Sequence, residues 1–357
     1  MWTHRWLTVG LVAAAVLIAV NVVAFNQAWS MTHFSRGGMR TENPESLSLL
    51  EKVRVSLLGV NLPRPINRID PSNLGLKFET HRFGGTDSAE LEGWFVPCAK
   101  AQGIVLFAHG YGASKGSLLV ETRAFHELGY AAFLLDFHGS GGSRGDGTSI
   151  GVREADDIAQ AVEYVRQKFP SRTLILYGQS MGSAAILRAI AVNGVRPTAI
   201  IVECPFDRLL STAANRLAAM GLPAFPGAHL LIFWGGVQHG FNAFRHNPVE
   251  YARAVHCPVL LLHGAKDTRV TRAQAESIFE NFPGEKEFTV FASAGHESYL
   301  GAAPGQWTES VSRFLERRQT EQPRERKQSS DPTGRASRRH AESDRLEIHR
   351  GAGSRTG

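Results

Sequence analysis

Cysteine is scarce in this sequence of 357 residues, and its scarcity excludes a protein held together by a framework of disulfides. The three cysteines, Cys98, Cys204 and Cys257, cannot all pair with one another. Cys204 ends one expected strand and Cys257 begins the next, so we expect them to lie about a strand length apart, roughly 17–20 Å. Because a disulfide needs Cα atoms closer than about 7 Å, we expect both thiols to be free.

The sequence also lacks a large excess of charge outside its carboxyl-terminal tail. The formal net charge is +6, and residues 318–357 hold ten Lys or Arg against six Asp or Glu, which is +4 of that total. The rest of the chain is therefore close to neutral, and its basic composition does not indicate a nucleic-acid partner. The tail is polar and nearly free of aromatic residues, so we expect residues 318–357 to be disordered.

One long apolar run lies near the amino terminus, from Trp6 to Phe25. About 20 helical residues span the roughly 30 Å hydrocarbon layer of a membrane, whereas the apolar core of a signal peptide is about 7–15 residues long. This length favours an uncleaved anchor within residues 1–29. A cleaved signal peptide, with Val22 and Ala24 before the cut, is the alternative. The flanking charges do not fix the orientation, and we expect the bulk of the chain to be extracytoplasmic.

Apolar runs of strand length alternate with amphipathic segments of helix length through residues 74–317. This alternation predicts one α/β domain with a mostly parallel central sheet and helices on both faces. An antiparallel hairpin, 76–83 and 90–96 joined by the turn 84–88, comes first. The further expected strands are 103–110, 131–136, 173–177, 199–203, 258–264 and 287–291. The expected helices are 118–128, 152–169 ending at Pro170, one from Met181, 271–282 and 306–317.

Two segments fall outside this alternation. Residues 30–73 form a proline-containing connector, with one short helix near 44–58 and nothing that suggests chemistry. Residues 206–253 are apolar but broken by Gly and Pro, and they form an insertion after a strand. Such an insertion at the carboxyl edge of a parallel sheet is a common place for a lid or a substrate pocket. The alternative is a cap that only completes the core.

The sequence Gly178-Gln179-Ser180-Met181-Gly182 joins a predicted buried strand to a predicted helix. A serine at such a junction sits on a sharp turn that exposes its hydroxyl, and the glycines leave room for the adjacent strand and helix. A second match to the pattern, around Ser143, lies in a glycine-rich loop with no helix after it. Only Ser180 therefore has the local structure that a nucleophilic serine needs.

A serine nucleophile requires a histidine base, and that histidine requires a carboxylate that fixes its tautomer. Asp267 follows the strand 258–264 and His296 follows the strand 287–291, so both fall at the same sheet edge as Ser180. Asp207 is the reserve acid. The competing histidines are His263, which we expect to be structural, and His239 and His246, which lie in the insertion.

An oxyanion intermediate needs preformed hydrogen-bond donors. We expect the backbone N–H of Met181 to be one, because it opens a helix, and the backbone N–H of Tyr111 to be the other. Tyr111 lies in His109-Gly110-Tyr111-Gly112, which follows the strand 103–110. The side chains of His109 and Tyr111 need do no more than pack.

Taken together, five motifs in register resemble the α/β-hydrolase fold superfamily, and their order and spacing are similar to its Bem46-like and serine aminopeptidase S33-like members. They are H-G-x-G at His109, D-x-x-G-x-G-x-S at Asp136, G-x-S-x-G at Gly178, H-G-x-x-D at His263 and G-H at Gly295. One departure is His138, where relatives commonly have Arg, and it puts in doubt a supporting network near the oxyanion loop. The resemblance implies a hydrolase of esters, thioesters, lysophospholipids or amides that needs no metal or other cofactor.

The sequence thus leads to a membrane-anchored serine hydrolase of acyl esters or thioesters, with Ser180, His296 and Asp267 as its triad and a small acyl or lipid molecule as its substrate. A serine peptidase on short peptides is the alternative within the enzyme class. It would need an acidic group for a free amine, and Glu203 or Glu297 could supply one. A catalytically silent binding module is the alternative outside that class, although silent members usually lose a triad residue.

Overall fold

Eight strands form one sheet in the computed structural model, which describes residues 2–44, 46–84, 90–169 and 173–329. The strands are β1 (Glu79–Gly84), β2 (Glu90–Val96), β3 (Ile104–Ala108), β4 (Ala131–Asp136), β5 (Leu174–Gln179), β6 (Ala199–Glu203), β7 (Val259–Gly264) and β8 (Lys286–Phe291). Each predicted strand is present, with β1 beginning later than expected. The predicted turn 84–88 and the helix stop at Pro170 fall largely or wholly outside the described residues.

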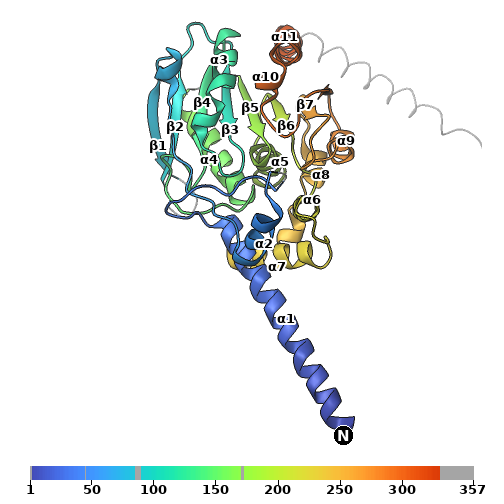
Figure 1. The fold of residues 1–357 in the computed structure, drawn as a ribbon. Helices are drawn as coiled ribbons and strands as arrows, with labels where there is room; N and C mark the ends of the chain where they lie inside the picture. The colour runs from blue at the N-terminus through green and yellow to red at the C-terminus, as the bar shows by residue number, and fades with distance from the viewer. Residues whose placement is uncertain (1, 45, 85–89, 170–172, 330–357) are drawn as a thin grey trace, which may run out of the picture. The chain divides into compact units, whose positions relative to one another are not determined.

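The order of the strands across the sheet is β1-β2-β4-β3-β5-β6-β7-β8. The β1–β2 and β2–β4 pairs are antiparallel and all the later pairs are parallel, which confirms the predicted hairpin and the mostly parallel sheet (Figure 1). Parallel strands end at one common edge, so the loops after β3, β5, β6, β7 and β8 can meet there.

Helices cover both faces of the sheet. On one face α4 (Arg153–Lys168), α5 (Met181–Asn193) and α9 (Arg272–Asn281) pack on alternate strand residues in a continuous apolar core. On the other face Phe125 of α3 (Leu119–Glu127) meets Phe107 and Tyr177 edge-on, with ring centroids 5.5 Å apart in each pair. The strands are therefore buried on both sides, as their near-continuous apolar sequences require.

The insertion between β6 and β7 is helical. It consists of α6 (Leu209–Ala219), α7 (Gly227–His239) and α8 (Pro248–Tyr251) with the short turns η4 (Ala243–Arg245) and η5 (Ala252–Ala254). Leu209, Ile232, Ala243 and Val270 form part of a small apolar cluster of its own. The insertion therefore has a small apolar core.

The amino-terminal helix α1 (Trp2–Thr32) extends the predicted apolar run at both ends. Its residues Arg5–Thr32 are long and apolar enough to span a membrane. Its last third is built into the domain: Trp234 Nε1 of α7 donates to Asn21 Oδ1 at 3.1 Å, and Gln238 Nε2 donates to the Phe25 carbonyl at 2.8 Å. Helix α2 (Leu49–Leu58) follows in the connector, and its capping box is formed by Ser48 and Glu51.

The last helix is α11 (Pro304–Ser329). It runs past the predicted end at Arg317, so the expected disorder does not describe residues 318–329. Gln, Glu, Arg and Lys dominate there, and these are good helix formers. Residues 330–357 lie outside the described part of the chain. All three cysteines are free, which confirms the prediction made for Cys204 and Cys257.

Space at the β5–α5 junction is tight enough to test by substitution. A Cβ added to Gly182 would lie 2.2 Å from the Ala108 carbonyl oxygen of β3. We expect Gly182→Ala to lower the free energy of unfolding by about 1–3 kcal/mol, because the clash is with backbone and cannot relax through a rotamer. Chemical denaturation measures this.

Gly305→Ala in α11 is the matched control, because a Cβ there meets nothing within 4 Å. It should leave the stability unchanged or raise it slightly. Equal stabilities of the two variants would contradict the close packing described here.

Candidate active site

Ser180 occupies a strained turn between β5 and α5. Its φ of 49° and ψ of −110° lie in a region that L-residues rarely adopt, at a cost of about 1–3 kcal/mol. The flanking glycines explain how the turn fits: a Cβ on Gly178 would lie 2.7 Å from the Ser183 nitrogen, and Gly182 meets β3 as described. The Ser180 N–H donates to the Glu203 carbonyl at 2.9 Å, which ties the turn to β6.

Three residues far apart in the sequence form one hydrogen-bonded line at the carboxyl edge of the sheet. His296 Nε2 lies 3.0 Å from Ser180 Oγ, and His296 Nδ1 lies 2.7 Å from Asp267 Oδ2. The second carboxylate oxygen, Asp267 Oδ1, accepts the backbone N–H groups of Arg269 at 2.8 Å and Val270 at 2.9 Å. The carboxylate is thereby fixed, and it orients the imidazole toward the serine.

The electrostatics of this line follow from burial and pairing. Burial alone would raise the pKa of the Asp267 carboxyl, but the His296 hydrogen bond and the two backbone amides hold it below its ordinary value. Burial alone would lower the pKa of the His296 imidazole, but the adjacent Cys204 side chain and the Asp267 carboxylate raise it. When Nδ1 carries the proton and donates a hydrogen bond to Asp267, Nε2 is free to accept the Ser180 proton.

Cys204 is the residue beside the triad that sequence reasoning did not place there. Its Sγ, a carboxylate oxygen of Asp267 and a ring nitrogen of His296 lie within 4.8 Å of one another, a spacing that could also hold a metal ion. Both ring nitrogens of His296 are already engaged with Ser180 and Asp267. The arrangement therefore suits proton transfer better than metal ligation. The only signal in the sequence was the position of Cys204 directly after β6.

The rival residues do not reach Ser180. His263 is fully buried, and His246 Nε2 lies 3.0 Å from the Ile150 carbonyl. His239 lines the pocket, but its ring stacks on His33 with centroids 5.2 Å apart. Asp207 accepts a hydrogen bond from Arg208 Nη1 at 3.2 Å. The structure thus brings together Ser180, Asp267 and His296 and none of these alternatives.

The loop after β3 lies against the serine turn. A Cβ on Gly110 would be 3.9 Å from Ser180 Cβ, and both Tyr111 and Met181 line the same pocket as Ser180. As the first residue of α5, Met181 has an N–H with no acceptor inside the helix. His109 supports the loop from below, because its Nε2 accepts the Phe137 N–H at 3.3 Å and its Nδ1 meets the Gly110 carbonyl at 2.9 Å.

The amino-terminal segments hold this loop from the other side, which the sequence did not suggest. Tyr111 Oη donates to the Met31 carbonyl of α1 at 2.5 Å, and Arg40 Nη1 donates to the Gly112 carbonyl at 2.8 Å. Arg40 and Pro44 of the connector also line the pocket. The connector, whose sequence suggests no chemistry, therefore forms part of the pocket wall.

A buried ionic cluster supports the loop further along. The Lys115 ammonium group is fully buried and pairs with Asp136 and with Glu92, the latter at 2.9 Å. Asp136 also accepts the Lys115 N–H at 2.8 Å and the Gly142 N–H at 2.8 Å. The second G-x-S-x-G serine belongs here: Ser143 Oγ donates to the Asp136 carbonyl at 2.6 Å and is buried.

His138, the departure from the family pattern, keeps a supporting hydrogen bond. Its Nδ1 lies 2.7 Å from Asp157 Oδ2, and its backbone N–H donates to the same oxygen at 3.0 Å. Burial would lower the pKa of His138, but Asp157 and Glu154 raise it to about 9. The imidazole is therefore cationic at neutral pH and can fill the place of a positive Arg.

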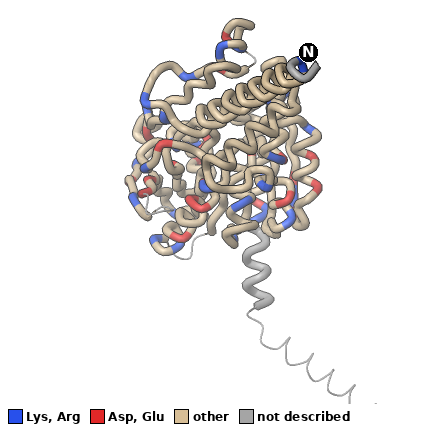
Figure 2. The backbone as a smooth tube through the Cα atoms, turned by 90° about the horizontal axis from the view of Figure 1, so that it is seen from below, with Lys and Arg blue, Asp and Glu red and all other residues tan. Residues whose placement is uncertain are grey.

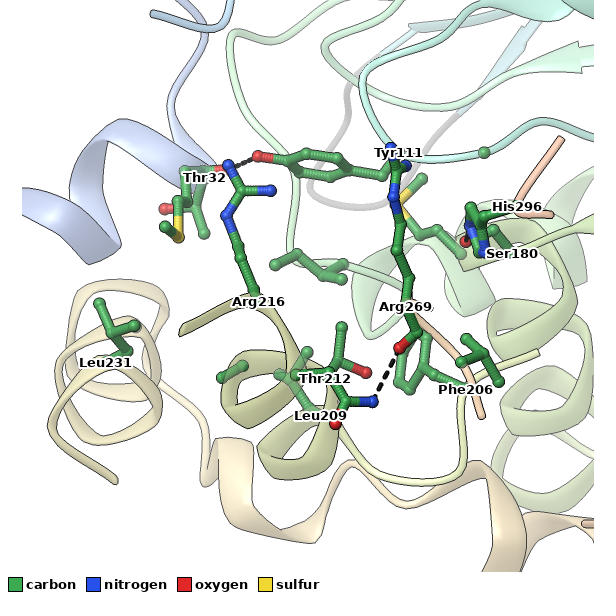
Figure 3. Close-up of a pocket in the computed structure, with 18 of the residues that line it drawn as sticks. Thr32, Tyr111, Ser180, Phe206, Leu209, Thr212, Arg216, Leu231, Arg269 and His296 are labelled. Atoms are coloured by element: carbon green, nitrogen blue, oxygen red, sulfur yellow. Dashed lines mark hydrogen bonds between the residues drawn. The ribbon is translucent and has the colours of Figure 1, made fainter. Parts of the chain in front are cut away.

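A pocket of about 330 Å³ opens above Ser180 and His296 (Figure 3). Apolar side chains from α1 and from the insertion make up much of its wall, including Ala28, Met31, Phe206, Leu209, Leu231 and Ile232. Its charged side chains are Arg40, Arg216, Arg269 and Glu297. The insertion thus lines a pocket, which is the first of the two roles that its sequence allowed.

Residues 99–230 match the family model described as serine aminopeptidase, S33. The chain is 26% identical over 230 residues to the uncharacterized protein YqkD of Bacillus subtilis, covering 64% of this chain and 75% of that protein. It is 24% identical over 182 residues to the lysophosphatidylserine lipase ABHD12 of Danio rerio, covering 50% of this chain and 46% of the lipase. It therefore spans less than half of that lipase.

Solved structures share the fold. The Pyrococcus furiosus esterase Pf2001 superimposes with a TM-score of 0.62 at 22% identity, covering 72% of this chain and 97% of the esterase. The Pyrococcus horikoshii acylaminoacyl peptidase superimposes with a TM-score of 0.53 at 19% identity, covering 68% of this chain and 41% of the peptidase. This likeness confirms the α/β-hydrolase fold that the five motifs predict.

The Asp267–His296 pair generates a pH prediction. If His296 acts as the base, its neutral imidazole is required, which is present above its pKa, and Asp267 raises that pKa. In Asp267→Asn the pKa falls, so the acidic limb of the rate profile should move to lower pH while kcat/KM falls about 10⁴-fold, because Asn no longer fixes the tautomer. The pH profile of p-nitrophenyl acetate hydrolysis measures both.

Asp207→Asn, which alters the reserve acid, is the control and should keep the wild-type profile. A limb that does not move in Asp267→Asn, or one that moves in Asp207→Asn, would refute the assignment.

Proposed function

This chain is a member of the α/β-hydrolase superfamily, and on that premise we propose that it is a membrane-anchored serine hydrolase that cleaves carboxylic ester or thioester bonds of acyl substrates. The observation that carries the proposal is the hydrogen-bonded line from Ser180 through His296 to Asp267 at the floor of a largely apolar pocket. A nucleophile, its base and an orienting carboxylate are the groups that acyl transfer requires.

In the proposed reaction Ser180 Oγ attacks the carbonyl carbon while His296 Nε2 takes the serine proton. The N–H groups of Tyr111 and Met181 stabilise the oxyanion, and Asp267 stabilises the imidazolium. Collapse of the tetrahedral intermediate expels the alcohol or thiol, which His296 protonates, and leaves an acyl ester on Ser180. Water, deprotonated by His296, then attacks that ester and releases the carboxylic acid and the free serine.

The charges of the pocket favour an ester over a peptide with a free amine. Glu203 does not line the pocket: it is fully buried, and it accepts Trp307 Nε1 at 2.8 Å and Gln179 Nε2 at 3.1 Å. Glu297 lines the pocket beside three arginines. An ammonium group would meet net positive charge there, whereas a neutral or anionic acyl substrate would not. The apolar wall suits an acyl chain.

Retention of α1 fits this proposal better than its cleavage. Ala24 and Ala28 are buried, and a cut after Ala24 would remove the Asn21 side chain that accepts the Trp234 hydrogen bond. Met31 holds Tyr111 through its carbonyl. Ala28 and Met31 follow that cut and would remain in either case, so the Asn21–Trp234 hydrogen bond is the contact that cleavage would remove.

The nucleophile is tested with a fluorophosphonate probe on the full-length protein. We expect covalent labelling of the wild type and its complete loss in Ser180→Ala, because the probe phosphonylates an activated serine. Ser143→Ala, in the second G-x-S-x-G, is the matched control and should retain labelling per folded molecule. Equal labelling of Ser180→Ala and wild type, or none of the wild type, would sink the proposal and would favour the silent binding module.

The substrate class is tested with p-nitrophenyl esters of increasing chain length beside aminoacyl p-nitroanilides. We expect kcat/KM for the best ester to exceed that for the best anilide by at least about 100-fold, because the pocket is apolar and cationic rather than acidic, and each factor of ten is about 1.4 kcal/mol of discrimination. A preference for the anilides would favour the peptidase instead.

A further inference from the structure

The surface of α7 divides into three faces. Ile232 and Gly236 point inward and are buried, while Trp234 and Gln238 bind α1. The third face is open to solvent and apolar: Phe233 is 49% exposed and Val237 is 54% exposed. Neither the core nor α1 covers this third face.

The loop before α7 continues this face. Residues 221–226, Gly-Leu-Pro-Ala-Phe-Pro, are all exposed, and Phe225 is 74% exposed. The sequence from Leu217 to Phe244 contains no Asp, Glu, Lys or Arg. An exposed stretch of this kind would aggregate in water unless something apolar covers it.

Helix α2 adds a second exposed apolar face at the same end of the domain. Its outward residues Leu49, Leu50, Leu57 and Leu58 are each more than half exposed. Lys52 Nζ donates to the Ala219 carbonyl at 3.0 Å, which ties α2 to the end of α6 and to the loop that carries Phe225. Figure 1 shows α2, α6 and α7 gathered where α1 leaves the domain.

The length of the apolar part of α1 determines where along this helix a bilayer would begin and end. The helix rises 1.5 Å per residue, so the apolar stretch from Trp6 to Phe25 covers about 30 Å, the thickness of the hydrocarbon layer. Phe25 is the residue whose ring meets Trp234 of α7, with centroids 5.4 Å apart. Trp29 follows one turn later and is 49% exposed, as aromatic residues at a membrane surface commonly are. A bilayer spanned by α1 would therefore end at α7.

The same elements line the pocket. Ala28, Met31 and Thr32 of α1, together with Leu231 and Gly235 of α7, face the space above Ser180. Residues 6–35 contain no Asp, Glu, Lys or Arg, and Figure 2 accordingly shows α1 in tan where it runs up to the body of the protein. An acyl chain that reaches this pocket from the membrane surface would meet the apolar side chains of Ala28, Met31 and Leu231.

We infer that the open face of α7, the loop 221–226 and the leucines of α2 form a lipid-binding surface that sits in the headgroup layer of the membrane spanned by α1, and that an acyl lipid passes from this layer to Ser180. The substrate class rests on the proposed function, whereas the contact with lipid does not. Helix α1 then forms a wall of the site and sets the distance of the site from the bilayer, in addition to holding the enzyme at the membrane.

The contact is tested with full-length protein in phosphatidylcholine vesicles that contain a trace of diazirine-bearing phosphatidylcholine. After irradiation and digestion we expect lipid adducts on peptides from residues 221–237 and none on the peptide that carries Val192. Val192 is also 54% exposed but lies at the end of α5 distant from Ser180, so it is a matched reference. Absence of adducts on 221–237, or cross-linked dimers through this face, would overturn the proposal whether or not the protein is an enzyme.

The route of the substrate is tested with Val237→Asp and Val192→Asp in the same vesicles. Both variants should hydrolyse water-soluble p-nitrophenyl acetate within about twofold of wild type, which also shows that they fold. On vesicle-borne p-nitrophenyl palmitate only Val237→Asp should lose activity, by about tenfold, because a carboxylate resists immersion at a membrane surface. Equal palmitate rates in the two variants would overturn delivery from the membrane. If the wild type does not hydrolyse p-nitrophenyl acetate, the proposed function is instead refuted.

Discussion

The close contact of helix α5 with strands β3 and β5 is the constraint on which the site depends. Gly182 leaves no room for a side chain against Ala108, so the helix can begin only where it does. That position forces the strained backbone of Ser180, whose hydroxyl then projects beyond the sheet edge. Local strain of this kind persists because a large core, packed on both sides of β5, stabilises the surrounding structure far more than the turn costs.

Charge is buried where it positions the loops of the site. The Lys115 ammonium group, with Asp136 and Glu92, is held in the interior just after the loop that carries Tyr111. Removing one partner of such a cluster leaves an uncompensated charge, which costs more than the cluster itself contributes. The loop is therefore fixed at one end by ions and at the other by hydrogen bonds to Met31 and from Arg40.

The amino-terminal helix thus combines the features of a membrane span with those of a pocket wall. Its first two thirds have the length and composition of a membrane span, while its last third supplies pocket wall and hydrogen bonds. In the proposed function, the same helix determines both the access of the substrate and the place of the protein in the membrane.

The sequence by itself determined the strands, the α/β class and the candidate triad, because each depends on local signals: apolar runs of strand length, glycines around one serine, and an acid and a histidine directly after later strands. The parallel sheet then brought the loops that carry Ser180, Asp267 and His296 together at one edge. Tertiary structure alone decided the roles of Cys204, Arg40 and Met31. Their contacts join segments that are distant along the chain, and no periodicity or motif in the sequence encodes which side chain will face a pocket that three separate segments enclose.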